Sequence, residues 1–176
     1  MRVTFIGHSG FLVETATAYF LFDYFHGGIP ALDRDKPLVV FASHKHRDHY
    51  NPEIFNLFED YPWVRFVLDK DCGIKWKIRE WADRGMDLTV KLIRVRKNQK
   101  YDLVMPGDKR LQITTYRSTD AGVAYLLEWE GQRIYHAGDL GHWIWEDRSE
   151  EYNRRMAERY RSEMAKMKGL SVDVAF

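Results

Sequence analysis

The sequence predicts an α/β fold in a single domain covering residues 1–176, and three observations lead there. The first half of the chain alternates segments of strand and helix character, and its middle is rich in strands separated by turn signals. An amphipathic helix follows near the end. Apolar residues make up 45% of the chain and charged residues 30%, which is typical of a globular protein with a real core.

The first elements are expected to be strands. Residues 2–8 alternate between apolar and polar, and two short strands are expected within 10–16 and 18–25. The run PLVVFAS at 37–43 is continuously apolar, which favours a central strand buried on both faces. Pro37 can begin such a strand without breaking its hydrogen bonds.

Two helices are expected in the next segment. Asn51 is a good N-cap and Pro52 suits the first helical position, so a helix should begin there. A strand is expected at 63–69 and a second helix within 70–85, with Gly85 at its end. The apolar stripe of this helix is expected at Ile74, Ile78 and Trp81.

The middle of the chain is expected to form strands at 88–96, 101–105, 110–117, 122–130 and 132–138. The turn signals PGD and EG stand between some of them. A helix is then expected within 149–169, ending near Gly169. Its apolar stripe should comprise Tyr152, Met156, Tyr160, Met164 and Met167.

The last seven residues, LSVDVAF, read as a buried strand with no polar tail after it. We therefore expect the chain to lack the C-terminal part of its domain. Such a strand would leave an open edge that favours pairing with a second chain, so a homo-oligomer stays open.

Composition excludes several classes of partner. The net charge is +1 and the basic residues are scattered, so neither a nucleic-acid nor a membrane partner is expected. No apolar run reaches the roughly 18 residues that a membrane helix needs. One cysteine, Cys72, rules out an internal disulfide and suits a reducing compartment, and the N-terminus resembles no signal peptide. A cytoplasmic protein is expected.

The stretch SHKHRDHY places His44, His46, Asp48 and His49 within six residues, and it contains three of the seven histidines. Residues two apart at the end of a strand point to one face, so His44 and His46 should converge. Imidazole and carboxylate ligands without a thiolate suit Zn, Mn or Fe. The alternative is that these are surface histidines in a loop.

The same stretch, with the following NP, resembles the HxHxDH motif of the metallo-β-lactamase superfamily. The resemblance implies an αββα sandwich with a metal site at strand ends between two sheets. The stretches GHSGFLVE, RSTDAGVAYLLEW and IYHAGDL look most like the L-ascorbate-6-phosphate lactonase-like branch of hydrolases.

The resemblance also implies roles for two aspartates. Asp23 in YFLFDYF matches an aspartate that ends an early strand and orients the His-rich loop. A simple turn residue is the alternative for this position. Asp139 in IYHAGDL matches the carboxylate that bridges two metals in the family.

The chain departs from the family pattern in two places. The family has a third histidine ligand where Ser118, Thr119 and Asp120 stand here. Asp120 as its replacement would favour Mn or Fe over Zn, whereas the alternative is that Asp120 only shapes a turn. The last histidine of the family is also missing, because no histidine follows His142.

Several nearby residues are candidates for the substrate pocket. His142 is expected either to compensate for the missing histidine or to stay outside the ligands. Trp143 and Trp145 are expected as pocket walls, with plain packing as the alternative. His8 ends the first strand, where it would either bond near the site or serve the fold alone.

The resulting functional prediction is a metal-dependent hydrolase with a small-molecule substrate. One or two divalent ions, Zn first and Mn or Fe as alternatives, would activate a hydroxide for attack on an ester, lactone, phosphodiester or related bond. Asp48 would orient the hydroxide and transfer protons as the catalytic residue. One alternative is a degenerate member that binds metal or ligand without turnover. Another is a nuclease, against which the nearly neutral charge counts.

Overall fold

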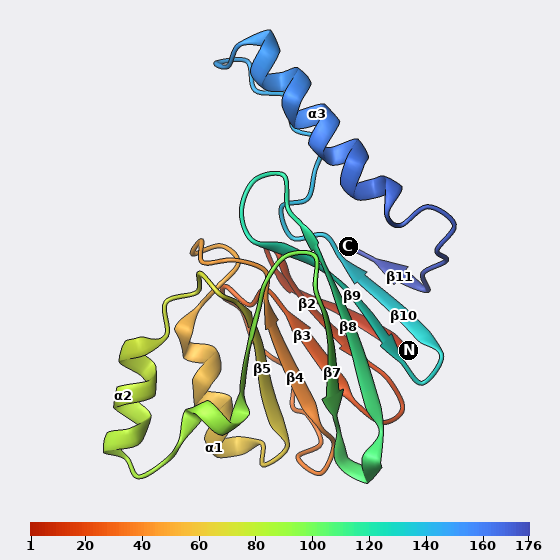
Figure 1. Ribbon diagram of the computed structural model, residues 1–176. Helices are drawn as coiled ribbons and strands as arrows, with labels where there is room; N and C mark the ends of the chain where they lie inside the picture. Colours follow the sequence, from red (N-terminus) through yellow and green to blue (C-terminus); the bar gives the residue numbers. More distant parts are fainter. The chain divides into compact units, whose positions relative to one another are not determined.

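The computed structural model describes residues 1–176 and divides into two compact units. The first comprises residues 1–95 and 105–108, and the second comprises residues 96–104 and 109–176. Each unit contains one β-sheet, and helices are few (Figure 1). The predicted mixed α/β class is therefore confirmed.

The first unit contains a six-stranded sheet in the order β1-β2-β3-β4-β5-β6. Its strands are β1 (Arg2–Gly7), β2 (Gly10–Glu14), β3 (Tyr19–Phe22), β4 (Leu38–Ala42), β5 (Val64–Asp69) and β6 (Leu92–Val95). β1, β2 and β3 pair antiparallel, whereas β3 to β6 run parallel. The carboxyl ends of these four parallel strands consequently meet at one edge of the sheet.

β4 is the central strand that the sequence predicts. Each of its five residues is buried, with at most 1% of its surface exposed. Its even-numbered residues belong to an apolar cluster shared with Phe55 and Trp81 from the helical segments. These segments are the 3₁₀ turns Pro52–Asn56 and Leu88–Lys91 with the helices α1 (Leu57–Asp60) and α2 (Lys75–Asp83). Burial on both faces explains why β4 lacks polar residues.

Two boundaries in this unit differ from the sequence prediction. Asn51 caps the predicted helix through a 2.9 Å bond from the Glu53 amide, but that helix begins as a 3₁₀ turn. The predicted strand 88–96 is wrong in its first half. The Asp87 side chain accepts the Thr89 amide at 2.9 Å and caps a 3₁₀ turn, so the strand begins only at Leu92.

The second unit contains a five-stranded sheet in the order β11-β10-β9-β8-β7. Its strands are β7 (Lys100–Val104), β8 (Arg110–Arg117), β9 (Val123–Trp129), β10 (Gln132–His136) and β11 (Val174–Ala175). β7 to β10 form an antiparallel meander, and β11 adds in parallel to β10. Glu130 and Gly131 both have positive φ, as a tight turn between β9 and β10 requires.

Helix α3 (Glu150–Ala165) lies in the second unit (Figure 1). The Ser149 hydroxyl caps its N-terminus by accepting the Tyr152 amide. Met156 is buried, and Tyr160 and Met167 pack against a small cluster on the sheet. The predicted stripe is wrong at Tyr152 and Met164, each 37% exposed. No helix in the structure combines the length and apolar character needed to cross a membrane.

The predicted C-terminal buried strand is also wrong in extent and burial. Only Val174 and Ala175 pair with β10, and Ala175 is exposed. Leu170 and Val172 are 41% and 42% exposed. β11 lies at the edge of the sheet and pairs only with β10 through backbone hydrogen bonds. This pairing does not require its side chains to be buried.

Candidate metal centre

The His-rich loop follows β4 at the carboxyl edge of the parallel strands. β4 ends at Ala42, so His44 and His46 do not lie on a strand and the predicted period-two alignment does not apply. Instead, the loop folds back, because the His49 and Tyr50 amides both donate to the His46 carbonyl at 3.0 and 2.9 Å. This turn, rather than the pleat of a strand, brings the imidazoles together.

Asp23 supports the loop from the end of β3. Its side chain is fully buried, and its Oδ1 accepts the Ser43 amide at 2.7 Å. Its Oδ2 accepts the Ser43 hydroxyl at 2.6 Å and lies 2.7 Å from His49 Nδ1. A buried carboxylate needs several donors of this kind to offset the loss of its hydration. Asp23 also adopts a positive φ of 43°, which aspartate tolerates better than most residues.

These bonds fix which ring nitrogens face outward. His49 donates from Nδ1 to Asp23, which leaves the lone pair on its Nε2. The Ser43 hydroxyl has one proton, which it gives to Asp23, so it accepts from His44 Nδ1 at 3.0 Å. The lone pair of His44 is therefore also on Nε2. Partners of this kind on the far ring nitrogen orient histidines that bind metals.

His44 and His46 form a close pair of nitrogens. His44 Nε2 lies 3.0 Å from His46 Nδ1, and the two rings stand at 85° to each other. A shared proton can occupy this gap as a hydrogen bond. A metal ion can also replace the proton, because two Zn–N bonds of about 2.0–2.1 Å meeting at one ion give a similar separation. The His49 ring centre lies 4.3 Å from that of His44.

Asp48 lies beside these imidazoles with its side chain 46% exposed. Its Oδ2 is 3.7 Å from His49 Nε2 and 3.3 Å from His8 Nε2. His8 comes from the turn between β1 and β2, and the neighbouring Ser9 hydroxyl donates to the Asp48 backbone carbonyl. The Asp48 carboxylate thus lies beside the imidazoles and remains open to solvent.

Cys72 lies at the same edge of the sheet but has different properties. The thiol is 1% exposed, and burial, reinforced by Asp69 and Asp23, raises its pKa above the usual range. It stays protonated at neutral pH, so it is unsuited to bind a metal as thiolate. The donor set of this edge therefore consists of nitrogen and oxygen atoms only.

In the second unit, Asp139 follows β10 in a loop held by Thr119. The Thr119 hydroxyl bonds with the Asp139 carbonyl at 3.2 Å and with the Gly141 carbonyl at 2.7 Å, and it accepts the Gly141 amide at 3.0 Å. Trp143 Nε1 donates to the Asp139 carbonyl at 3.1 Å. The backbone around this carboxylate is consequently well fixed.

The remaining candidates of the second unit are exposed. Asp120 sits in the turn between β8 and β9, where its amide donates to the Ser118 hydroxyl at 3.2 Å. His142 stacks on Tyr160 with ring centres 5.5 Å apart. Trp143 and Trp145 are 40% and 43% exposed. Their ligand and pocket roles stay predictions.

Sequence reasoning did not single out Ser43 and Ser9, although both carry hydrogen bonds of the loop. A serine directly before His44 is the only signal that the first of them offers. Nothing in the sequence marks Ser9, because its partner is a backbone carbonyl 39 residues away.

The profile of the β-lactamase superfamily domain matches residues 2–155, which is most of the chain. The chain belongs to the β-lactamase superfamily. A protein of Desulforamulus reducens described as "UPF0173 metal-dependent hydrolase" is 39% identical over 146 residues. That match covers 80% of this chain and 63% of the relative, so the chain spans less than two thirds of the relative's length.

Two solved structures of low identity resemble the fold of this superfamily member. Igni18, a metallo hydrolase from the archaeon Ignicoccus hospitalis, is 20% identical with a TM-score of 0.52, covering 82% of this chain and 62% of its own. CmlA, a diiron β-hydroxylase from Streptomyces venezuelae, is 14% identical with a TM-score of 0.59, covering 99% of this chain and 33% of its own. At these identities the likeness is one of fold.

Proposed function

We propose that the protein is a metal-dependent hydrolase with its metal centre at the His-rich loop. The observation that carries this proposal is the buried Asp23 carboxylate, which fixes His49 directly and His44 through Ser43. Burying a carboxylate costs free energy, and its bonds here turn Nε2 of both rings away from Asp23. Family membership and the name of the Desulforamulus reducens relative support the same reading.

The residues present fit a divalent metal. His44 and His46 would provide two nitrogens, and His49 and Asp48 would add a third nitrogen and a carboxylate oxygen. We propose Asp139 as a further ligand on its sequence position alone. The set is nitrogen and oxygen without sulfur, which suits Zn and also Mn or Fe. We propose Zn first, with one or two ions bound.

A bound ion would lower the pKa of a coordinated water molecule and so provide a nucleophile at neutral pH. Asp48 would orient that water and take its proton, because its carboxylate is half exposed and lies near His49 Nε2. His8, 3.3 Å from the same carboxylate, would help to hold it in place. Asp23 would act as a positioning residue, since it reaches the site only through other side chains.

The substrate is proposed to be a small molecule with an ester, lactone or phosphodiester bond. The lactonase-like branch remains part of the proposal on the strength of the quoted sequence stretches. A cytoplasmic location is also proposed, from the single buried cysteine.

The test is an assay of the whole chain, purified without chelator, against lactone, carboxylate ester and phosphodiester substrates. Hydrolysis should disappear on chelation and return with Zn or Mn. Asp48→Asn, assayed at saturating metal because Asp48 is also a proposed ligand, should lower kcat by about 100-fold or more, as for loss of a general base. Bound metal without turnover of any substrate class would favour the binding role instead.

A further inference from the structure

A second group of residues at the carboxyl edge of the first unit is not used by the proposed hydrolysis. A cavity of about 450 Å³ lies after β5, at the start of α2 and beside β6. Its polar and aromatic lining residues are Lys70, Asp71, Lys75, Trp76 and Arg94. A volume of this size accommodates a small organic molecule. In open parallel sheets, ligands bind at this edge of the strands.

The charges of this cavity are not balanced. Three cationic side chains face it, but Asp71 is its only carboxylate, and Asp71 pairs with Lys70 at 3.5 Å. Lys75 and Arg94 make no ion pair. A cavity with two uncompensated cations attracts anions.

Arg94 gives the most specific indication. One terminal nitrogen of its guanidinium donates to the Lys70 backbone carbonyl, which fixes the plane of the group. Its Nε is buried and has no hydrogen-bond partner. A guanidinium carries five N–H donors. A buried donor without an acceptor lowers the stability of the folded protein. The remaining N–H groups of this guanidinium can bind an oxyanion, which neutralises its charge.

Trp76 adds a surface for the organic part of a ligand. Its side chain is 53% exposed, and Lys77 lies over its ring at 4.6 Å. A tryptophan kept this exposed next to unpaired cations can cover a planar group attached to an anion.

The cavity is also connected with the candidate metal centre inside the same unit. Tyr50 donates its hydroxyl to the Gly73 carbonyl at 3.3 Å, and its amide donates to the His46 carbonyl at 2.9 Å. The loop that carries the imidazoles and the loop that lines the cavity are therefore bonded to each other through one residue.

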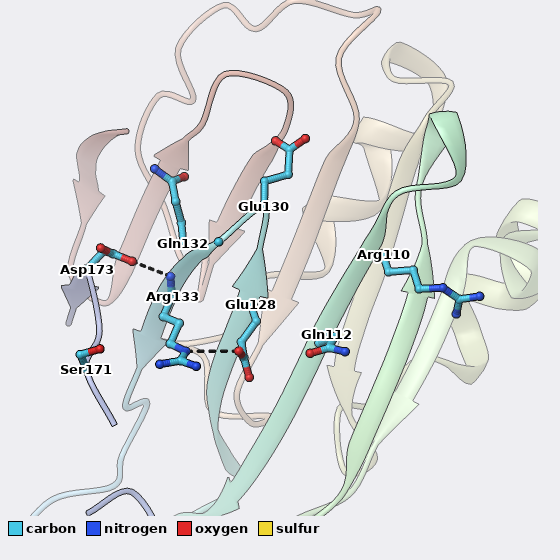
Figure 2. Close-up of a pocket in the computed structure, with 9 residues that line it drawn as sticks. Arg110, Gln112, Glu128, Glu130, Gln132, Arg133, Ser171 and Asp173 are labelled. Atoms are coloured by element: carbon cyan, nitrogen blue, oxygen red, sulfur yellow. Dashed lines mark hydrogen bonds and ion pairs between the residues drawn. The ribbon is translucent and has the colours of Figure 1, made fainter. Parts of the chain in front are cut away.

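The other large cavity, about 480 Å³ in the second unit, differs in this respect (Figure 2). Figure 2 shows its Arg133 joined to Glu128, at 3.2 Å, with the Arg133 amide joined to Asp173. Glu130 pairs with Lys109. Arg110 is left without an ion pair, but no buried donor accompanies it. Most charged side chains of this cavity are in ion pairs, so nothing here indicates a charged ligand.

We propose that the cavity lined by Lys75, Trp76 and Arg94 binds the oxyanion group, phosphate or carboxylate, of a small molecule with a planar organic part. The inference concerns binding and does not require hydrolysis. The anion can be a substituent of the substrate or a separate molecule.

The test is titration of the full chain with inorganic phosphate and with phenyl phosphate, followed through the indole NMR signal that Trp76→Phe removes. Both probes should shift this signal, and phenyl phosphate should bind more tightly. Arg94→Gln should weaken phosphate binding about tenfold or more, and Lys75→Gln about threefold or more, as for loss of charged hydrogen bonds. Lys75 is exposed, so its variant should keep the fold even if the Arg94 variant does not.

Arg110→Gln is the matched control, because it removes an unpaired arginine from the other cavity. It should leave phosphate binding unchanged. Absence of binding, or equal binding by the parent, Arg94→Gln and Lys75→Gln, would overturn the proposal. A further experiment distinguishes an anion that is part of the substrate from one that is a separate molecule. If the anion belongs to the substrate, Arg94→Gln raises KM for anionic esters and not for neutral ones. If it is a separate molecule, added phosphate changes turnover of a neutral ester in the parent only.

Discussion

The His-rich loop and the segment 118–145 both contain candidate metal ligands, but the side chains of the two regions differ in burial and in hydrogen bonding. Around the loop, Asp23, His44 and His49 are buried, and each has its orientation fixed by a hydrogen bond to another side chain. In segment 118–145, Asp120 and His142 are exposed, and the bonds found there hold mostly the backbone. One region orients functional groups, whereas the other orients the chain that bears them.

This difference indicates where binding affinity should depend on single side chains. A side chain already held in place loses little rotational freedom when it binds an ion. An exposed one must be ordered at that moment, which costs on the order of 1 kcal/mol or more per side chain. The loop should therefore dominate metal affinity, and the candidates of segment 118–145 should contribute less individually.

The largest effect is expected from replacing both His44 and His46 with alanine. The two nitrogens that lie 3.0 Å apart are lost together, so uptake of a divalent transition metal should be abolished. Metal content after gel filtration measures this. The control is His26→Ala, which removes an exposed histidine outside the loop. Equal metal content in the double variant and in this control would contradict the assignment.

The next effect concerns Asp23→Asn. Asparagine tolerates the positive φ of this position, so the change acts mainly on the side-chain bonds. An amide cannot accept from Ser43 and His49 as two carboxylate oxygens do. We expect a loss of about 1–3 kcal/mol in the free energy of unfolding. Metal affinity should fall about 10–100-fold.

Denaturant unfolding and metal titration check both quantities for Asp23→Asn. Asp102→Asn, at an exposed position of β7, provides the matched control. If both variants kept the parent's metal affinity, Asp23 would serve the fold alone.

A smaller effect is expected from Ser43→Ala. The variant removes one hydroxyl that bridges Asp23 and His44, at 2.6 and 3.0 Å, while leaving the backbone bond to Asp23 intact. The free energy of unfolding should fall by about 1 kcal/mol. Metal affinity should fall by less than in Asp23→Asn, because His49 keeps its partner. A larger loss of affinity than in Asp23→Asn would show that the support runs mainly through His44.

The smallest effect is expected from Asp120→Ala. The Asp120 side chain is exposed, and its amide is held by Ser118 whatever the side chain is. Metal affinity should change by less than about threefold, compared with about tenfold or more for loss of a ligand or its support. A tenfold loss, together with a shift toward Zn in Asp120→His, would identify Asp120 as the substitute for the missing family histidine.

Local patterns predicted the first unit's core well because its strands follow simple rules. The continuous apolar run of β4 and the cap at Asn51 are each encoded within a few neighbouring residues. The closeness of His44 and His46 was predicted as well, but for the wrong reason. A loop turn closed by the His46 carbonyl brings them together, and no periodicity describes such a turn.

The features that the sequence did not predict depend on hydrogen bonds and packing between residues far apart in the chain. Ser43 meets Asp23 across 20 residues, and Arg94 meets Lys70 across 24 residues. The exposure of Tyr152 and Met164 on α3 depends on how much of the helix the sheet can cover. Such facts depend on strand pairing and packing, which propensity does not describe.

The most direct test of the metal centre is X-ray absorption spectroscopy at the metal edge, on protein loaded with one equivalent of Zn. The account predicts at least two imidazole nitrogens at about 2.0–2.1 Å and no sulfur ligand. The bound-zinc signal itself should be lost in the His44→Ala, His46→Ala double variant, because this variant should no longer retain the ion. A spectrum without imidazole, or the same spectrum in the double variant, would contradict the claim that the His-rich loop holds the metal.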